Sequence, residues 1–153
     1  MRELRRKDRL INEQSANKIL VEGEYGVLST VDEHGQPYGV PLNYAYQDRC
    51  IYFHAAHMGH KIDNIAYNDR VSFCVVGKTK VIQSEFTTKY ESVICFGKAG
   101  IVEGEEKKKG LMGLIEKYSP DYLNAGLKAI EKSLKNVAVI KLEIEYISGK
   151  ASK

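Results

Sequence analysis

Residues 38–68 constrain the fold of this chain more than any other stretch. They run YGVPLNYAYQDRCIYFHAAHMGHKIDNIAYN in the printed sequence. Two segments of alternating apolar and polar residues, 38–46 and 50–54, flank the polar turn 47–49. This pattern is typical of a β-hairpin, since side chains on a strand alternate between two faces. The sequence therefore predicts a hairpin over residues 38–54.

The second of these segments leads into a loop of small residues that ends at Gly59, His60 and Lys61, and apolar residues then recur at helical spacing. A helix start offers unpaired backbone N–H groups and the positive end of the helix dipole. His60 and Lys61 would add charge-assisted donors at the same place. The sequence therefore predicts a phosphate site at this corner.

The rest of the chain supplies more strands and a few helices. β-Forming residues predict strands at 25–31, 71–76, 93–102 and 137–147, and apolar spacing predicts helices at 12–22, 62–67, 111–118 and 122–134. Six or seven strands at short spacing with few helices favour an antiparallel barrel.

Four local features carry finer expectations. Asn12 is the expected N-cap of the first helix. Pro41 cannot donate to a sheet ladder, so it indicates either a bulge or an edge strand. Residues 77–92 are expected to form polar connections, whose hydroxyl-rich second half could reach a cofactor. The lysines at 107–109 are expected on the solvated face of a helix.

Composition narrows the class of protein. The 153 residues are 43% apolar and 28% charged, which fits one globular domain with its own core. The formal net charge of +3 is too small to indicate nucleic acid, and no apolar run approaches the roughly 20 residues that span a bilayer. The N-terminus MRELRRKDRL lacks the apolar core of a signal peptide. We therefore expect a cytoplasmic protein that binds neither nucleic acid nor a membrane.

Several kinds of active site find no support. Cys50, Cys74 and Cys95 are odd in number and form no Cys-x-x-Cys pair, so we expect reduced, structural thiols. Histidines recur at 54, 57 and 60, but the first should end a strand and the last should start a helix, so no metal site is expected. The chain holds no Gly-x-Ser-x-Gly elbow, Gly-x-Gly-x-x-Gly loop or P-loop. The basic residues within 2–9 are expected to form a solvated N-terminal arm.

Four segments together resemble a known family. Residues 35–44 (GQPYGVPLNY), 51–54 (IYFH), 59–61 (GHK) and 70–73 (RVSF) resemble the FMN-binding split-barrel superfamily of pyridoxamine 5'-phosphate oxidases. Within it the chain is most similar to the nitroimidazole-resistance (nitroimidazole reductase) branch. The resemblance implies a mainly β fold with α (α+β), a six- or seven-stranded antiparallel split β-barrel flanked by short helices. It implies one FMN-binding domain over residues 1–153, with residues 1–10 as a basic arm, and a homodimer with FMN near the subunit interface.

The resemblance also implies which residues hold the cofactor. The implied FMN contacts are Val40, Pro41, Leu42, Asn43, Tyr44, His54 and Ala55 along the ring and ribityl chain, His60 and Lys61 at the phosphate, and Ser92 at the ring. In such homodimers some of these contacts come from the second subunit. His60 stands where the family has arginine, which makes phosphate binding sensitive to pH. The chain has no Trp and lacks the family's C-terminal Trp and Arg, so pyridoxamine 5'-phosphate is the less expected substrate.

These features favour a flavin-dependent reductase. The flavin ring carries the chemistry, and Tyr44, His54 and Tyr90 are the candidate donors to a substrate. The expected reaction is reduction of a small electrophile such as a nitroaromatic, with NAD(P)H or another electron donor. One alternative is a non-catalytic flavin or haem storage protein, with His54, His57 or His60 as an iron ligand. Another is a barrel that binds nucleic acid or a protein partner through residues 2–9.

Overall fold

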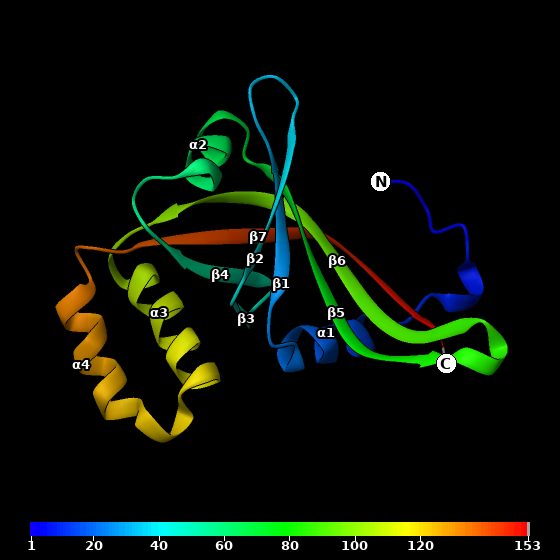
Figure 1. Cartoon of the computed structure of the whole chain (residues 1–153). Coiled ribbons are helices and arrows are strands. Elements are labelled where there is room, and N and C mark those ends of the chain that lie inside the picture. The colour runs from blue at the N-terminus through cyan, green and yellow to red at the C-terminus, as the bar shows by residue number, and fades with distance from the viewer. Residues whose placement is uncertain (153) are drawn as a thin grey trace.

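The computed structural model describes residues 1–152, and Lys153, the last residue of the predicted domain, lies outside the described residues. Seven strands form one antiparallel sheet in the order β2-β1-β5-β6-β7-β4-β3 (Figure 1). The strands are β1 Gly26–Val31, β2 Pro37–Leu42, β3 Ala45–Gln47, β4 Cys50–Ala55, β5 Arg70–Ile82, β6 Thr87–Val102 and β7 Ala138–Ser152. The predicted mainly β fold with flanking helices is confirmed.

The helices pack around this sheet. They are α1 Glu13–Glu22, α2 His60–Tyr67, α3 Gly104–Tyr118 and α4 Leu123–Ser133, with 3-10 turns η1 Lys7–Arg9, η2 Gln83–Glu85 and η3 Pro120–Tyr122. The Asn12 side chain accepts a 2.8 Å hydrogen bond from the Ser15 N–H, so the predicted N-cap is confirmed. Figure 1 shows α3 and α4 as a helical pair at one end of the molecule. Within residues 1–152 no helix combines the length and apolar character needed to cross a bilayer.

Aromatic rings hold the centre of the core. The Phe73 ring meets the Tyr44 and Phe53 rings edge to face, with centroids 4.9 and 5.0 Å apart. All three side chains are fully buried. A second apolar cluster joins α3 and α4 to the sheet through Tyr52 and Val139. This cluster fixes the helical pair against β4 and β7.

The predicted strand at 38–46 is wrong as one element. The chain leaves the sheet at Asn43, so β2 pairs with β1 while β3 pairs with β4, at opposite ends of the strand order. At this break Tyr44 lies outside the paired strands. Its N–H donates a 3.0 Å hydrogen bond to the Tyr118 hydroxyl of α3 instead. The predicted hairpin is confirmed over β3 and β4. Its turn residues Asp48 and Arg49 both have positive φ, as a two-residue turn of right-handed twist requires.

Pro41 lies on an edge strand and not at a bulge. Strand β2 ends the sheet, and its pairing with β1 is unbroken from Gly26 opposite Leu42 to Val31 opposite Pro37. An edge position removes the need for the N–H that proline lacks. Of the two alternatives for Pro41, the edge is therefore the one that the structure shows.

The predicted polar connections at 77–92 are wrong. Strand β5 continues to Ile82 and β6 begins at Thr87, joined by η2 and by Phe86 at φ 50°. We call residues 77–92 the arm, because Figure 1 shows this part of the hairpin extending away from the body of the protein. A ribbon with solvent on both faces needs no apolar alternation, which is why its sequence looked like a loop. Strand β7 likewise runs past the predicted end at residue 147 to pair with β6.

The lysine run at 107–109 is not wholly solvated. Lys107 is only 5% exposed, and its amine lies 3.6 Å from the Glu103 carboxylate, whereas Lys108 and Lys109 lie outside. The packing of α3 against the sheet covers the first lysine of the run. The expectation of a fully solvated lysine face is therefore wrong at this residue.

One face of the sheet keeps apolar side chains exposed. Neighbouring strands place Val27, Cys74 and Ile94 in one row, opposite in direction to the buried Leu28 and its partners. We define the outer face as Val27, Ser29, Ser72, Cys74, Val76, Tyr90, Ser92, Ile94, Phe96, Tyr146 and Lys150. Exposed fractions of 57% for Val76 and 37% for Ile94 show that this apolar surface is in contact with solvent.

Candidate functional site

The corner between β4 and α2 is built as an anion site would be. Gly59 is the N-cap of α2 with φ 139°, a backbone conformation that side chains rarely adopt, and nothing lies within 4 Å of where a Cβ would stand. No side chain caps this helix start. The first N–H groups of a helix have no intrahelical acceptor, so those of His60 and Lys61 are available to a ligand. The loop thus leaves both space and donors at the helix start.

The charges of the two basic side chains at this corner are not paired with a carboxylate among the described residues. His60 is exposed and Lys61 is half-buried. Among residues 1–152, neither belongs to an ion pair. The His60 ring stacks on the Tyr38 ring, with centroids 4.0 Å apart and planes 27° apart. Tyr38 lies on β2, so the stack joins the corner at α2 to the strand that leads to Asn43.

The residues from Val40 to Tyr44 alternate between core and surface. Val40 and Leu42 are half-buried against the core, whereas Pro41 and Asn43 are exposed. Tyr44 is fully buried, and its hydroxyl donates a 2.6 Å hydrogen bond to the Leu20 carbonyl. Burial raises the pKa of this hydroxyl well above its ordinary value. The structure places Tyr44 as a core residue whose proton is already used, which does not suit the expected donor to a substrate.

A lysine amine lies beneath this segment. The Lys117 Nζ lies 3.5 Å from the centre of the Tyr44 ring and 5.3 Å from that of Tyr118. It has no hydrogen-bond partner within residues 1–152. Burial lowers the pKa of Lys117 to about 8. A ring face attracts a cation, so the Tyr44 ring partly offsets the free-energy cost of burying the charged Lys117 amine.

Asn43 and His54 line the same pocket. This helix pocket, of about 250 Å³, lies between β4 and the helical pair, and its other lining residues are Leu111, Leu114, Ile115, Tyr118, Ser119, Ala129, Ile130, Ser133 and Val137. Its walls are mostly apolar. The Ser133 hydroxyl is occupied by the Ala129 carbonyl at 2.7 Å. The exposed His54 side chain is therefore a main polar group of a small apolar chamber.

The residue after His54 has a different environment. Ala55 is 7% exposed and belongs to the core. Of this implied pair, only His54 presents a side chain to the helix pocket. A ligand could therefore contact Ala55 only through its backbone.

The histidines do not converge. The His57 ring lies 3.0 Å from the Lys135 carbonyl, and His60 stacks on Tyr38, away from the helix pocket. Within residues 1–152 no three His, Cys, Asp or Glu side chains are grouped as metal ligands. The three histidines thus have three separate environments.

Ser92 and Tyr90 lie elsewhere, on the outer face of β6. Strand β5 begins just after α2, at Arg70 opposite Lys98 of β6. Ser92 lies six residues before Lys98, which separates these two residues by about 20 Å at the usual strand rise. Ser92 pairs with Val76 and Lys150. The predicted site residues therefore fall into two groups within one chain: the group around Asn43 and α2, and the group on the outer face.

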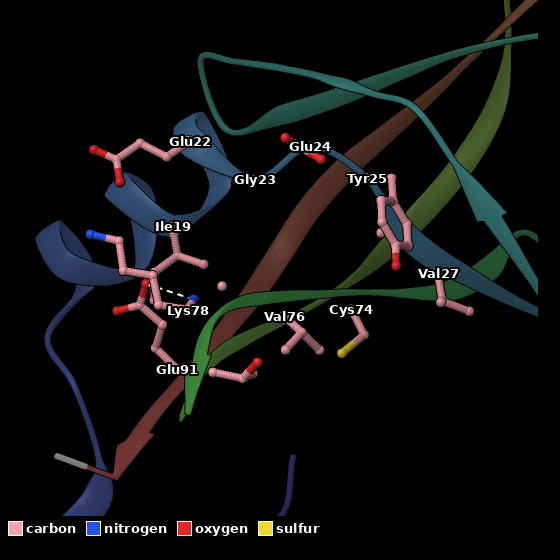
Figure 2. Close-up of a pocket in the computed structure, with 13 residues that line it drawn as sticks. Ile19, Glu22, Gly23, Glu24, Tyr25, Val27, Cys74, Val76, Lys78 and Glu91 are labelled. Carbon is pink, nitrogen blue, oxygen red and sulfur yellow. Dashed lines mark hydrogen bonds between the residues drawn. The ribbon is translucent and has the colours of Figure 1, made fainter. Parts of the chain in front are cut away.

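Sequence patterns gave no sign of a larger cavity beside the second group. It measures about 650 Å³ and lies between the end of α1 and the base of the arm. Figure 2 shows Val27, Cys74 and Val76 along it, and Glu91, whose carboxylate accepts a 3.2 Å hydrogen bond from the Lys78 N–H. The cavity opens onto the outer face. Its lining joins α1, β1, β5 and β6, which are far apart in the sequence, so no local pattern could have indicated it.

The single antiparallel sheet, split between its β2 and β3 edges and flanked by helices, defines a split-barrel protein. A family model described as pyridoxamine 5'-phosphate oxidase matches residues 12–151, and the chain belongs to that family. The resemblance found in the sequence is therefore confirmed. A comparison with curated proteins found no match.

Solved structures share the fold. A candidate 5-nitroimidazole antibiotic resistance protein from Bacteroides thetaiotaomicron has 24% identity and a TM-score of 0.77, over 95% of this chain and 90% of that one. A FAD-binding protein from Mesorhizobium loti has 24% identity and a TM-score of 0.66, over 95% and 98%. The haem storage protein of Vibrio cholerae has 17% identity and a TM-score of 0.69, over 93% and 95%. At these identities, the comparisons with solved structures show a common fold and nothing finer.

Proposed function

We propose that this chain binds FMN and uses it to reduce a small electrophile such as a nitroaromatic. The observation that carries the proposal is the helix pocket, where Asn43 and His54, both implied flavin contacts, line one apolar chamber. Ligand pockets of drug size measure about 300–1,000 Å³. A chamber of about 250 Å³ suits a single-ring compound.

The phosphate end of FMN suits the corner at α2. A phosphate needs hydrogen-bond donors and positive charge, and the corner offers backbone N–H groups, the His60 ring and the Lys61 amine. The open space at Gly59 allows the backbone to approach a ligand closely. The residues present therefore fit FMN at this end.

FMN supplies the hydride chemistry, and the chain supplies position and a dry site. His54, which lines the helix pocket, would donate a proton to an electrophile held there. The apolar walls from α3 and α4 would shield one side of that electrophile from water. For a nitro compound the step balances as follows: the nitro compound, NAD(P)H and a proton give the nitroso compound, NAD(P)⁺ and water.

The proposal includes a homodimer. The outer face exposes Val76, Ile94 and Tyr146, and these apolar side chains suit a second copy of the chain that would leave Tyr90 and the rest of the arm uncovered. Ser92 on that face would then contact the flavin held by the other subunit. A chain that sediments as a monomer with FMN bound would contradict this part of the proposal.

The structural relatives supply the competing candidate. One is described as FAD-binding and another as a haem storage protein. A storage protein on this barrel would use the same exposed His54 as an iron ligand. This alternative predicts tight haem binding without turnover.

One spectroscopic experiment separates the two. The purified chain is mixed with FMN, freed of excess ligand, and titrated with NADH or NADPH and then with a nitroaromatic such as metronidazole under anaerobic conditions. We expect bound flavin whose absorbance bleaches with the donor and returns with the nitro compound. A Soret band after addition of haem, with no flavin uptake, would instead support the storage protein.

A further inference from the structure

Two cations flank one tyrosine on the outer face of the arm. An Arg9 Nη1 donates to the Tyr90 hydroxyl at 3.4 Å, and the Arg9 guanidinium carbon lies 5.9 Å from the ring centre. The Lys150 Nζ lies 5.6 Å from the same centre. Hydrogen bonds from Lys150 and Arg9 lower the pKa of the Tyr90 hydroxyl. Residues 81 and 60 positions apart along the chain thus form one positive cluster.

This cluster is not neutralised by its surroundings. Arg9 and Lys150 form no ion pair in the part of the chain that the structure describes. The nearby Asp8 carboxylate is held by Arg6 at 2.6 Å. Glu91 lies between Tyr90 and Ser92 on β6, so its side chain leaves the strand on the opposite face. Positive charge therefore remains available to an anionic ligand.

An open groove continues from this cluster to the tip of the arm. It measures about 570 Å³, and Arg9 and Tyr90 form one end. Thr88 and Val81, which pair across the two strands, line its middle. Gln83 and Phe86 line the end at the tip of the arm, and Phe86 is 98% exposed. A groove with a positive cluster at one end and a fully exposed phenyl ring at the other suits a ligand that carries both a phosphate and a flat ring.

The spacing of residues along β6 predicts the order in which the parts of such a ligand would lie. Alternate residues of a strand share a face, so Ser92, Tyr90 and Thr88 follow one another on the outer face at intervals of about 7 Å. Ser92 is the residue expected at a flavin ring. The outer face of the arm therefore presents, in order, the expected ring contact Ser92, the positive cluster at Tyr90 and the exposed ring of Phe86. An extended nicotinamide dinucleotide has the same sequence of parts: a ring, a diphosphate and a second ring.

Resting on the proposed flavin chemistry, we infer that the outer face of the arm binds the nucleotide electron donor, with its diphosphate on Arg9, Tyr90 and Lys150 and its adenine on Phe86. The nicotinamide then lies at Ser92, where the flavin of the other subunit receives its hydride. The arm would thus make the donor a nicotinamide nucleotide and not a small organic reductant. It also gives the two chains of a dimer different roles at each site.

The test measures binding of ADP and of inorganic pyrophosphate to the full chain by calorimetry, with and without FMN. ADP carries the diphosphate and the adenine but cannot reduce flavin. We expect the double variant Arg9→Gln and Lys150→Gln to weaken both ligands at least tenfold. Phe86→Ala should weaken ADP several-fold and leave pyrophosphate unchanged. Lys89→Gln is the matched control, because Lys89 is an exposed lysine on the opposite face of the arm.

The outcomes separate this inference from the proposed function. If FMN binds and NADPH bleaches it, but ADP binding is absent or unchanged in the double variant, the arm site is wrong. The same holds if Lys89→Gln weakens ADP as much as the double variant does. If ADP binding follows the expected pattern while the chain takes up no FMN, the nucleotide site stands and the flavin proposal fails.

Discussion

The imidazole of His60 is stacked on the phenol ring of Tyr38, with 4.0 Å between the ring centroids. The stack links the first residue of α2 to β2, the strand that leads to the exposed Asn43. The two ends of the proposed flavin site are therefore mechanically connected. Since stacking fixes the imidazole plane, Tyr38 would pre-orient His60 toward a phosphate at the helix start.

Replacing Tyr38 by leucine is expected to weaken FMN binding about 2- to 10-fold, since an aromatic pair is worth about 0.5–1.5 kcal/mol. The loss arises because the imidazole becomes free to leave the phosphate. Flavin fluorescence quenching measures the dissociation constant. Tyr38→Phe keeps the stack and should bind FMN as the natural chain does. Equal losses in both variants would mean that the hydroxyl, and not the stack, supports the site.

His60→Arg is expected to strengthen FMN binding, because a guanidinium presents a planar pair of donors that matches a phosphate. The measurement is the dissociation constant of FMN. A variant that binds FMN no more tightly than the natural chain would remove His60 from the phosphate contacts.

Lys61→Ala is expected to cost about 1.5–3 kcal/mol of FMN binding, the usual contribution of a hydrogen bond to a charged group. Lys61 is half-buried at the helix start, next to the backbone N–H groups that the phosphate would also use. The exposed Lys128 on α4 provides the control, since Lys128→Ala removes the same charge far from α2. An unchanged dissociation constant in Lys61→Ala would exclude this amine from the site.

Filling the helix pocket should act on the substrate and not on the cofactor. Ile130 is 9% exposed and lines the pocket from α4, so Ile130→Phe reduces its volume. We expect KM for a nitroaromatic to rise about tenfold, equal to about 1.4 kcal/mol, with FMN affinity unchanged. Leu127→Phe, on the exposed side of the same helix, is the control. If both variants have the natural KM, the electrophile binds elsewhere.

Local patterns predicted the corner at α2 well. Gly59, His60 and Lys61 are consecutive, and the helix after them has a clear apolar period, so sequence proximity became spatial proximity. The N-cap at Asn12 could be predicted for the same reason, because the capping side chain and the Ser15 N–H that donates to it are three residues apart. In both cases the relevant contacts lie within one turn of helix.

Contacts between distant segments could not be predicted in this way. Tyr44 was expected inside a continuous strand at 38–46 and as a donor to a substrate, but its hydrogen bonds with Leu20 and Tyr118, 24 and 74 residues away, hold it in the core where the strand breaks. Arg9 and Lys150 meet only because the N-terminal segment lies beside the end of β7. The arm was missed for a different reason: its two solvated faces remove the apolar alternation by which strands are recognised.

The buried amine of Lys117 predicts how stability changes with pH. Its pKa is lowered by burial to about 8 from the ordinary 10.5, so between these values the unfolded chain holds more protons than the folded chain. Stability contributed by this group therefore rises as pH increases from 8 toward 10.5, and the full penalty is present below pH 8. Lys117→Met removes the stability cost of burying the charged amine and, with it, this group's contribution to the pH dependence of stability.

At pH 7 we expect Lys117→Met to stabilise the fold by about 1 kcal/mol, since an unsatisfied buried donor costs about 1–3 kcal/mol and the attraction to the Tyr44 ring returns part of it. For a chain of this length that is about 2–4 °C in Tm. The buried tyrosines and thiols titrate in the same alkaline range with the opposite sign. The difference in unfolding free energy between the two chains, measured in urea from pH 7 to 9.5, cancels their contribution. The advantage of Lys117→Met should shrink across this range. A constant difference, or a variant that is less stable at pH 7, would show that the ring attraction outweighs desolvation and that Lys117 stays charged.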